Sequence, residues 1–242
     1  MKTLILSTAA LALTAGLAMA DGHAKTIRMG TEGAYPPYNF LDDNGEVAGF
    51  EREVGDELCA RAELTCEWVT NEWDSIIPNL VSGNYDVIIA GMSITDERDE
   101  VIDFSDPYTL PDPSAYLAAG EIDPASAILA AQSGTIQAAH IASMEGAQLV
   151  EFATPEETVA AVKNGEADAV LADKSFLAPI AEADAELQLL AQQELIGGGI
   201  GLGVRESDGE LRAKFNTAIQ SMKDDGSLNA LLEKWLPEAE LF

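Results

Sequence analysis

Two segments of the chain repeat one pattern of helix, glycine, aspartate and buried strand. Leu80–Ala90 reads LVSGNYDVIIA, and Val162–Ala172 reads VKNGEADAVLA, 82 residues further on. Gly83 and Gly165 are typical of the residue that ends a helix, and the continuous apolar runs after them are typical of parallel strands covered on both faces. The repeat predicts an α/β fold of two lobes, each a small, mostly parallel sheet flanked by helices.

Polar residues follow both of the predicted buried strands. Ser93–Thr95 comes soon after the first strand, and Asp173–Ser175 directly after the second. In open α/β sheets, ligands bind beyond the carboxyl ends of the strands. Two similar lobes that each present such strand ends therefore predict one ligand site, in the cleft between them.

Prolines and glycines indicate two places where the chain crosses between the lobes. Three prolines crowd residues 107–113, and a glycine run occupies Gly197–Gly201. We therefore expect lobe one to comprise residues 21–112 and 198–242, and lobe two residues 113–197. Two crossings permit hinge closure of the lobes around a ligand.

Local patterns predict the elements of lobe one. Ile27–Gly30 is a short strand, and Asn44-Gly45 is a hairpin turn signal. Apolar residues at every fourth position from Phe50 predict a helix that ends near Ala62. Near the C-terminus we expect two amphipathic helices, separated by Gly226 and stopped by Pro237.

Residues 1–20 have the pattern of a secretory signal peptide. Lys2 precedes an apolar stretch that ends in Ala18-Met19-Ala20, a small-x-small cleavage site. A transmembrane anchor is the alternative, but the stretch is short and rich in alanine for a bilayer span. Position 21 is Asp rather than Cys, so no lipid attachment is expected. We expect cleavage after Ala20 and a soluble, exported protein in the periplasm.

The charge balance excludes some partners. The chain has 42 Asp and Glu against 13 Lys and Arg, a net charge of −29, and 47% of its 242 residues are hydrophobic. Such a chain has enough apolar residues for a core, but it would be repelled by nucleic acid and by an anionic membrane surface. A solvated acidic surface is the simplest interpretation of the charge.

Cys59 and Cys66 are the two cysteines of the chain, seven residues apart. In an oxidising compartment such a pair favours a structural disulfide. A metal pair is the alternative, but there are no other thiols, and His23 and His140 are the two imidazoles. We therefore expect a disulfide, and neither a metal site nor a cofactor.

Two segments have the composition of an anion site. In Ser93–Arg98 a serine, exposed backbone N–H groups and a guanidinium fork could hold a carboxylate. A surface Arg98 paired with Asp96 or Asp99 is the alternative, and the spacing alone does not decide between them. Gln132–Thr135 is a Gly-Thr turn before a predicted helix, whose N-terminus favours anions.

Four further residues are candidates for contact with a cation or an apolar group. Asp173 ends the second buried strand, where its carboxylate could hold an ammonium group or instead cap the helix that follows. Glu32 supplies another anion, and Tyr35 and Trp73 supply aromatic faces that belong either to the core or to a ligand pocket. Trp73 stands in a polar stretch, which favours a stacking or cation–π surface.

The order of several motifs resembles the periplasmic polar amino-acid-binding proteins of ABC importers, solute-binding protein family 3. Within that family the chain is most similar to the lysine/arginine/ornithine and opine binders, whose cysteine pair also matches. The resemblance covers nearly all of the chain after residue 20 and implies the two-lobed type II periplasmic binding protein fold. It is carried by Thr31–Tyr38, Gly49–Glu51, Trp73–Leu80, Met92–Arg98, Phe104–Tyr108 and Gly199–Arg205.

The resemblance implies how the main-chain end of an amino acid would be held. Arg98 would clamp the ligand α-carboxylate, helped by Ser93 and by Thr135 from the other lobe. Asp173 would take the α-ammonium group, with the carbonyl of Gly91 nearby.

The resemblance also implies how the ligand side chain would be read. Trp73 and Tyr35 would flank it, and Glu32 would pair with a guanidinium or ammonium group. The chain departs from several relatives at Gly91, where they carry Ser or Thr, and at Ile136, which replaces a polar residue. A roomier cleft keeps opines, which carry an added carboxylate, as alternative ligands.

The function implied is capture of an amino acid by closure of the lobes, with a cationic amino acid (arginine, lysine or ornithine) as the favoured ligand. The closed monomer would then deliver the ligand to a membrane ABC permease, with no catalysis. Two other classes stay open as alternatives: a ligand sensor for a chemoreceptor, and a periplasmic dehydratase in which Glu32 or Asp173 acts as a general acid.

Overall fold

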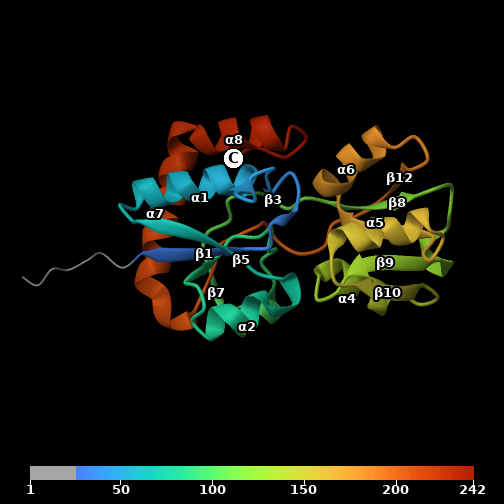
Figure 1. The fold of residues 1–242 in the computed structure, drawn as a ribbon, viewed down its shortest axis with the longest axis horizontal. Helices are drawn as coiled ribbons and strands as arrows, with labels where there is room; N and C mark the ends of the chain where they lie inside the picture. Colours follow the sequence, from blue (N-terminus) through green and yellow to red (C-terminus); the bar gives the residue numbers. More distant parts are fainter. Residues whose placement is uncertain (1–25) are drawn as a thin grey trace, which may run out of the picture.

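The computed structural model describes residues 26–242, which form two α/β lobes that lie side by side (Figure 1). The predicted fold class is confirmed. The five-stranded sheet of lobe one has the order β5 (Cys66–Thr70), β1 (Ile27–Thr31), β6 (Val87–Ile88), β13 (Gly203–Val204) and β7 (Asp103–Phe104). The five-stranded sheet of lobe two has the order β10 (Gln148–Phe152), β9 (Ile128–Gln132), β11 (Ala169–Asp173), β8 (Ser114–Ala118) and β12 (Gln188–Glu194).

Each sheet contains one strand that runs against the others. Parallel pairs join β1 to β5 and β6, and β9 to β10 and β11. The exceptions are β13 and β8, which are antiparallel to both of their neighbours. The prediction of mostly parallel sheets is confirmed, but the sequence pattern did not identify the reversed strands. Both strands come directly after a crossing between the lobes. Each therefore begins at the end of its sheet where the parallel strands have their carboxyl ends.

The two halves of the sequence repeat occupy equivalent places. Helix α2 (Ile76–Val81) precedes β6, and α5 (Pro155–Lys163) precedes β11; β6 and β11 are each third in their sheet. Gly83 (φ 80°) and Gly165 (φ 72°) have the left-handed conformation just after these helices, as a helix-ending glycine requires. The repeat therefore specifies the middle of both sheets.

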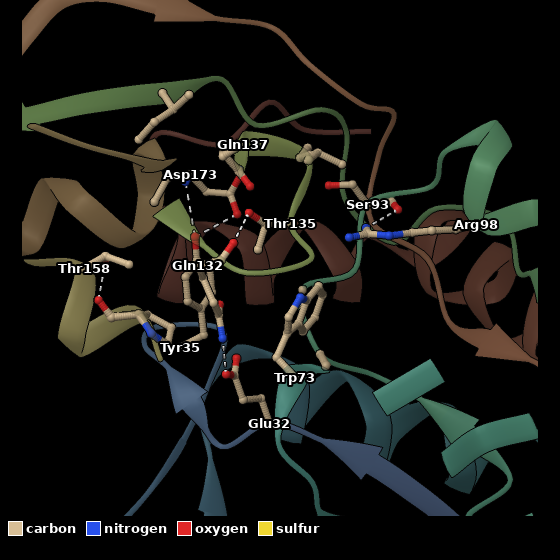
Figure 2. A pocket seen from close by; sticks show the side chains of 16 residues that line it. Glu32, Tyr35, Trp73, Ser93, Arg98, Gln132, Thr135, Gln137, Thr158 and Asp173 are labelled. Atoms are coloured by element: carbon tan, nitrogen blue, oxygen red, sulfur yellow. Dashed lines mark hydrogen bonds between the residues drawn. The ribbon is translucent and has the colours of Figure 1, made fainter. Parts of the chain in front are cut away.

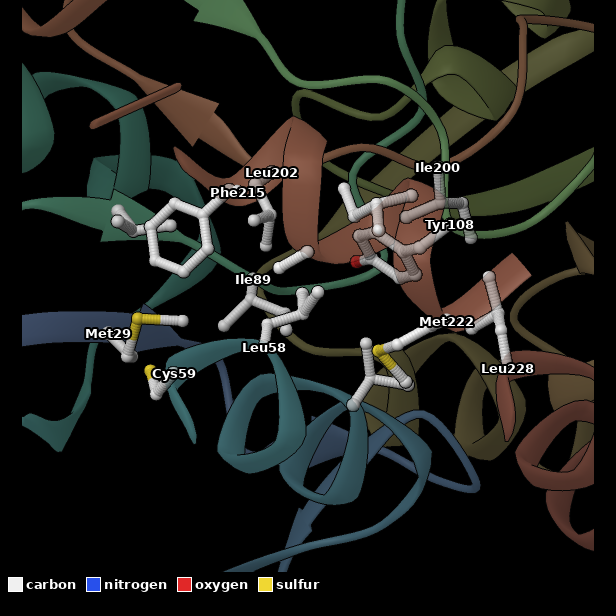
Figure 3. Close-up of a cluster of buried hydrophobic side chains, with 14 of the residues drawn as sticks. Met29, Leu58, Cys59, Ile89, Tyr108, Ile200, Leu202, Phe215, Met222 and Leu228 are labelled. Carbon is white, nitrogen blue, oxygen red and sulfur yellow. The ribbon is translucent and has the colours of Figure 1, made fainter. Parts of the chain in front are cut away.

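Three helices cover one face of the lobe-one sheet: α1 (Phe50–Arg61), α7 (Gly209–Asp225) and α8 (Ser227–Trp235). Leu58 of α1 and Phe215 and Met222 of α7 are fully buried in the cluster that joins these helices to the sheet (Figure 3). The predicted helix from Phe50 ends within a residue of the expected position, and Gly226 separates α7 from α8 as expected. This cluster is the larger of the two that form the core of lobe one; the smaller one packs α2 against the sheet.

Lobe two is a three-layer sandwich. Helices α5 and α6 (Lys174–Ala183) pack on one face of its sheet, and α4 (Ile136–Ser143) packs on the other. Neighbouring residues of β11 alternate between the two faces, Val170 toward α5 and α6 and Leu171 toward α4. The continuous apolar sequence of this strand therefore has the predicted cause, burial on both faces.

The remaining elements are short. A small antiparallel sheet of β2 (Ala34–Tyr35), β3 (Asn39–Leu41) and β4 (Val47–Ala48) contains the predicted hairpin turn at Asn44-Gly45, with Gly45 at φ 80°. One further α-helix, α3 (Asp96–Asp99), and three 3₁₀ turns, Trp73–Ser75, Pro124–Ser126 and Glu206–Asp208, complete the elements of the described residues.

Two joining segments connect the lobes, one between β7 and β8 and one between β12 and β13. The boundaries expected at 112/113 and 197/198 fall inside these segments and stay a prediction. The predicted signal peptide, residues 1–20, and its cleavage after Ala20 lie outside the described residues. Within residues 26–242, no helix combines the length and apolar character needed to cross a bilayer.

A disulfide joins Cys59 of α1 to Cys66, the first residue of β5, which confirms the predicted pairing. The bond closes a short loop at the end of α1. It therefore holds that helix against the edge strand of the sheet that it covers.

We expect replacement of both cysteines by alanine to lower the free energy of unfolding by about 2–3 kcal/mol, because the cross-link restricts the unfolded chain. Urea denaturation of the parent and the double variant measures this difference. A reductant should produce the same loss in the parent and none in the double variant. Equal stability of the two proteins would contradict a structural role for the disulfide.

Candidate functional site

The carboxyl ends of the parallel strands of both lobes meet at a cavity of about 40 Å³ between the lobes (Figure 2). All eight predicted ligand-site residues line it: Glu32, Tyr35, Trp73, Gly91, Ser93, Arg98, Thr135 and Asp173. The structure thus brings the predicted residues together, while their roles toward a ligand stay predictions. The other lining residues are Ala90, Gln132, Ile136, Gln137, Pro155, Thr158, Leu171 and Ala172.

Arg98 is held at the cavity by lobe one and faces lobe two. Its backbone N–H bonds to Thr95, the N-cap of α3 (3.2 Å), and its guanidinium donates from Nη1 to the Ser93 carbonyl (2.9 Å) and from Nη2 to the Gly134 carbonyl (3.3 Å). The guanidinium also lies 5.4 Å from the centroid of the Trp73 ring. The described residues show no ion pair of Arg98 with a neighbouring aspartate, so the surface alternative is wrong.

Burial lowers the pKa of Arg98 to about 10, partly offset by the negative charge of Asp173. The guanidinium therefore keeps its charge at neutral pH. Two of its five N–H groups are taken by backbone carbonyls, which leaves others to donate to a carboxylate. A partly buried guanidinium with unused N–H groups favours an anionic group in the cavity.

Asp173 ends β11 on the opposite side of the cavity. Its Oδ2 accepts from the Tyr35 hydroxyl (2.9 Å) and its Oδ1 from the Gln137 amide (2.9 Å). It occupies the N-cap position of α6, but its side chain makes no capping bond there, so the capping alternative is wrong. Burial, and then the charge of Asp112, raise the pKa of Asp173 to about 7.

Glu32 directly follows β1 and points from lobe one toward lobe two (Figure 2). Its Oε1 accepts a hydrogen bond of 2.6 Å from the side-chain amide of Gln132. Burial is the main cause that raises the pKa of Glu32 to about 7, with smaller contributions from Asp74 and Glu51. The cavity thus contains a second carboxyl group that would gain from a cationic neighbour.

Aromatic rings form part of the cavity wall. Tyr35 stacks on Phe176 of lobe two, with ring centroids 4.4 Å apart, and its hydroxyl reaches Asp173. Trp73 begins a 3₁₀ turn and lies against the guanidinium of Arg98. Tyr35 and Trp73 are therefore pocket residues, as the resemblance implied.

Gly91 and Thr135 are placed by their backbone conformations. Gly91 has φ 63°, a left-handed value that favours glycine, and its N–H donates to Glu51 (2.6 Å). The helix predicted after the Gly-Thr turn is α4, and Thr135 is its N-cap. Its hydroxyl accepts from the Ala138 N–H (3.2 Å) and donates to the Gln132 carbonyl (2.7 Å).

Sequence reasoning missed three polar residues that support the site. Gln132 and Gln137 donate to the two cavity carboxylates, and buried Glu51 accepts from Asn39, Tyr108 and the Gly91 N–H. Gln132 and Glu51 lay in motifs already recognised, but no spacing rule indicated what their side chains contact. These contacts join residues that are 12 to 100 positions apart in the sequence.

Hydrogen bonds across the cavity show that the lobes are closed on each other. Glu32 bonds to Gln132, Tyr35 to Asp173, and Arg98 to the carbonyl of the turn before α4, each pair joining lobe one to lobe two. Of the cavity-lining residues in the described part of the chain, Arg98 is the one cation, against two carboxyl groups. With all three groups ionised, the cavity has a formal charge of −1.

Residues 27–238 match the family model of the bacterial extracellular solute-binding proteins, family 3. The chain belongs to this family. The resemblance found in the motifs is thereby confirmed, and the two five-stranded sheets are the two lobes of a solute-binding protein.

Three relatives illustrate the similarity of this solute-binding protein to known ones. A solved periplasmic His/Glu/Gln/Arg/opine family-binding protein from Silicibacter pomeroyi, in complex with lysine, is 65% identical; the match covers 90% of this chain and 100% of that chain, with a TM-score of 0.87. The lysine/arginine/ornithine-binding periplasmic protein of Escherichia coli (strain K12) is 30% identical, with 95% and 96% of the two chains covered. The octopine-binding periplasmic protein of Rhizobium meliloti is 31% identical, with 94% and 95% covered.

We expect Glu32→Gln to stabilise the ligand-free protein by about 1–3 kcal/mol at pH 8, and to have little effect near pH 4. The pKa of Glu32 is raised to about 7, whereas an unfolded glutamate titrates near 4. The unfolded chain therefore binds fewer protons between these values, and stability falls as the pH rises through that window. Denaturation midpoints at several pH values measure the difference between variant and parent.

The exposed Glu210 of α7 offers a matched control. Glu210→Gln should show no comparable gain at pH 8. A gain from Glu32→Gln that is equally large at pH 4 would show that something other than ionisation in the cavity is responsible.

Proposed function

We propose that this chain is a periplasmic solute-binding protein that captures a cationic amino acid, arginine, lysine or ornithine, by closure of its lobes. The observation that carries the proposal is the set of charges in the cavity, one guanidinium and two carboxyl groups. A cationic amino acid has the opposite set, one carboxylate and two cationic groups. Each buried charge of the site then meets a partner, which burial requires.

The positions of the groups support a specific arrangement of the ligand. Arg98, at the edge of the cavity next to Ser93 and Thr135, would hold the α-carboxylate. Asp173 would hold the α-ammonium group, with the Gly91 carbonyl near it.

The ligand side chain would extend toward the third charged group. It would pass between Tyr35 and Trp73, and Glu32 would pair with its terminal cation. Because these residues come from both lobes, the ligand would bind the closed form better than the open form and so shift the population toward closure.

The names of the relatives agree with this charge count. One is solved with lysine, and another is named for lysine, arginine and ornithine. Octopine, which a third relative is named for, belongs to the opines, which carry an added carboxylate. That group would need a second cation, and the described cavity-lining residues include one, Arg98. The cavity therefore favours a simple cationic amino acid over an opine.

Family membership supports the periplasmic location and the ABC permease as partner, while the cleavage after Ala20 and the monomeric state are carried over from the sequence as predictions. We place the protein in the periplasm after removal of residues 1–20, as a monomer whose closed form delivers its ligand to a membrane ABC permease. The relatives are named as binding proteins, which supports a role in binding without catalysis.

We expect arginine, lysine or ornithine to raise the melting temperature of the ligand-stripped protein. A ligand at a thousand times its Kd adds about 4 kcal/mol, which corresponds to roughly 8–16 °C for a chain of this size. A thermal-shift panel that also contains histidine, glutamine, glutamate and octopine measures the selectivity. A shift with octopine or neutral amino acids alone would contradict the cationic assignment.

We expect Arg98→Ala to weaken binding of every α-amino acid by about a hundredfold or more, because it leaves the ligand carboxylate buried without its partner. Glu32→Gln should weaken cationic ligands by about tenfold or more and leave neutral ones within about threefold. Isothermal titration with arginine and citrulline measures both effects. Arg212, a half-exposed residue that pairs with Asp103 on lobe one, offers the control Arg212→Ala, which should bind normally.

A further inference from the structure

Gln132 connects the two lobes at the carboxylate assigned to the ligand side chain. It is the last residue of β9 in lobe two, is 7% exposed, and lies 100 residues from Glu32 in the sequence. Its Nε2 donates to Glu32 Oε1 over 2.6 Å (Figure 2). This contact between a residue of lobe one and a residue of lobe two depends on closure of the cleft.

A second hydrogen bond fixes the orientation of the Gln132 amide. The same Nε2 donates to the carbonyl of Ala153 over 3.1 Å, in the segment between β10 and α5. Both acceptors, a carboxylate and a carbonyl, require a donor, so the amide must present its nitrogen and not its oxygen to Glu32. Lobe two therefore offers Glu32 one N–H group in a fixed position.

The bond leaves half of the Glu32 carboxylate available to a ligand. Within residues 26–242, Gln132 is the hydrogen-bond donor to Oε1, and Oε2 accepts no hydrogen bond. A carboxylate can accept at both oxygens. With Oε1 fixed by the amide, Oε2 can receive a cation from the cavity.

The neutrality of the amide matters for the charge of the site. A lysine or arginine at position 132 would orient Glu32 equally well, but it would cancel the charge of the carboxylate. Glutamine orients the group and leaves the formal charge of the cavity at −1. Gln132 thus orients the Glu32 carboxylate without neutralising the charge that would attract a ligand cation.

We propose that Gln132 is a positioning residue that determines selectivity for cationic side chains, by aligning the Glu32 carboxylate toward the ligand when the lobes close. This inference rests on the proposed function. It makes recognition of the distal cation depend on closure, because the aligning group belongs to the opposite lobe. The same residue also receives the Thr135 hydroxyl on its backbone carbonyl, so it contacts residues assigned to both ends of the ligand.

The variant Gln132→Met tests this role, because methionine has a similar length and no donor. Titration calorimetry with arginine and with citrulline, its neutral analogue, gives the ratio of the two affinities. We expect about a tenfold or greater loss of arginine affinity, as for a lost hydrogen bond to a charged group, and a change of citrulline affinity within about twofold. Equal losses for both ligands would overturn the proposal and leave Gln132 a merely structural residue.

Gln137→Met provides a matched control in the same cavity. Gln137 is also buried, and its Nε2 donates to Asp173 (2.9 Å), the group assigned to the α-ammonium that every amino acid carries. Its loss should weaken arginine and citrulline by the same factor. An arginine-selective loss in Gln137→Met as well would also overturn the proposal, because selectivity would then not depend on the contact with Glu32.

A double-mutant cycle on arginine affinity tests the coupling without a neutral ligand. In the Glu32→Gln background, Gln132→Met should cost less than about twofold, since the carboxylate that it aligns is gone; an additive loss would overturn the proposal. Failure of the parent protein to bind arginine, lysine or ornithine would instead overturn the proposed function. The two failures are therefore distinguishable in the same set of titrations.

Discussion

The placement of three charged groups, one buried and two partly buried, between two lobes is the constraint on which the rest of the structure depends. An ionised group removed from water is costly unless it has a partner, and here Arg98, Asp173 and Glu32 share one small cavity. Backbone carbonyls hold the guanidinium, and neutral amide and hydroxyl donors hold the carboxylates. These neutral donors satisfy hydrogen bonding without neutralising charge. The pKa values of both carboxyl groups remain raised, which means that their ionised forms are still disfavoured in the cavity. A ligand with two cationic groups would stabilise these ionised forms.

The path of the chain makes this convergence possible. The parallel strands of both sheets end at the cavity. Asp173, the last residue of β11 in lobe two, therefore faces a common space with Glu32 and Gly91, which follow β1 and β6 in lobe one. After the two crossings, β8 and β13 run antiparallel to their neighbours and away from the cavity, so neither adds a carboxyl end there. Beneath the site, the buried carboxylate of Glu51 fixes the Gly91 N–H and so the strand-end turn itself. The backbone at the strand ends therefore determines both the path of the chain and the positions of the site residues.

Several features of the fold could be predicted from the sequence, because interactions between neighbouring residues determine them. The glycine stops, the buried strand of the repeat and the Thr135 cap each depend on neighbouring residues alone. Whether Asp173 caps its helix or faces the cavity is not a local question, since Tyr35 and Gln137 compete for its oxygens from distant segments. The same holds for Gln132, whose partner is 100 residues away, and for the direction of β8, which follows from the crossing that precedes it. Sequence reasoning thus identified the three charged groups of the cavity and Tyr35, but missed the two glutamines that donate to the cavity carboxylates and the buried Glu51.

That division has a physical basis. A charged residue at a strand end is conspicuous because its burial needs an explanation, whereas a glutamine is ordinary at most positions. Yet closure can be selective only if the free energy of the closed state depends on what fills the cavity. In the proposed function, the charges set the sign and number of groups that a ligand must bring, and the neutral donors set where those groups must lie. Two hydrogen bonds, Glu32–Gln132 and Tyr35–Asp173, connect the opposite lobes. Opening of the cleft would therefore break the arrangement that we propose to bind the ligand. On this proposal, ligand recognition and closure of the lobes depend on the same few hydrogen bonds.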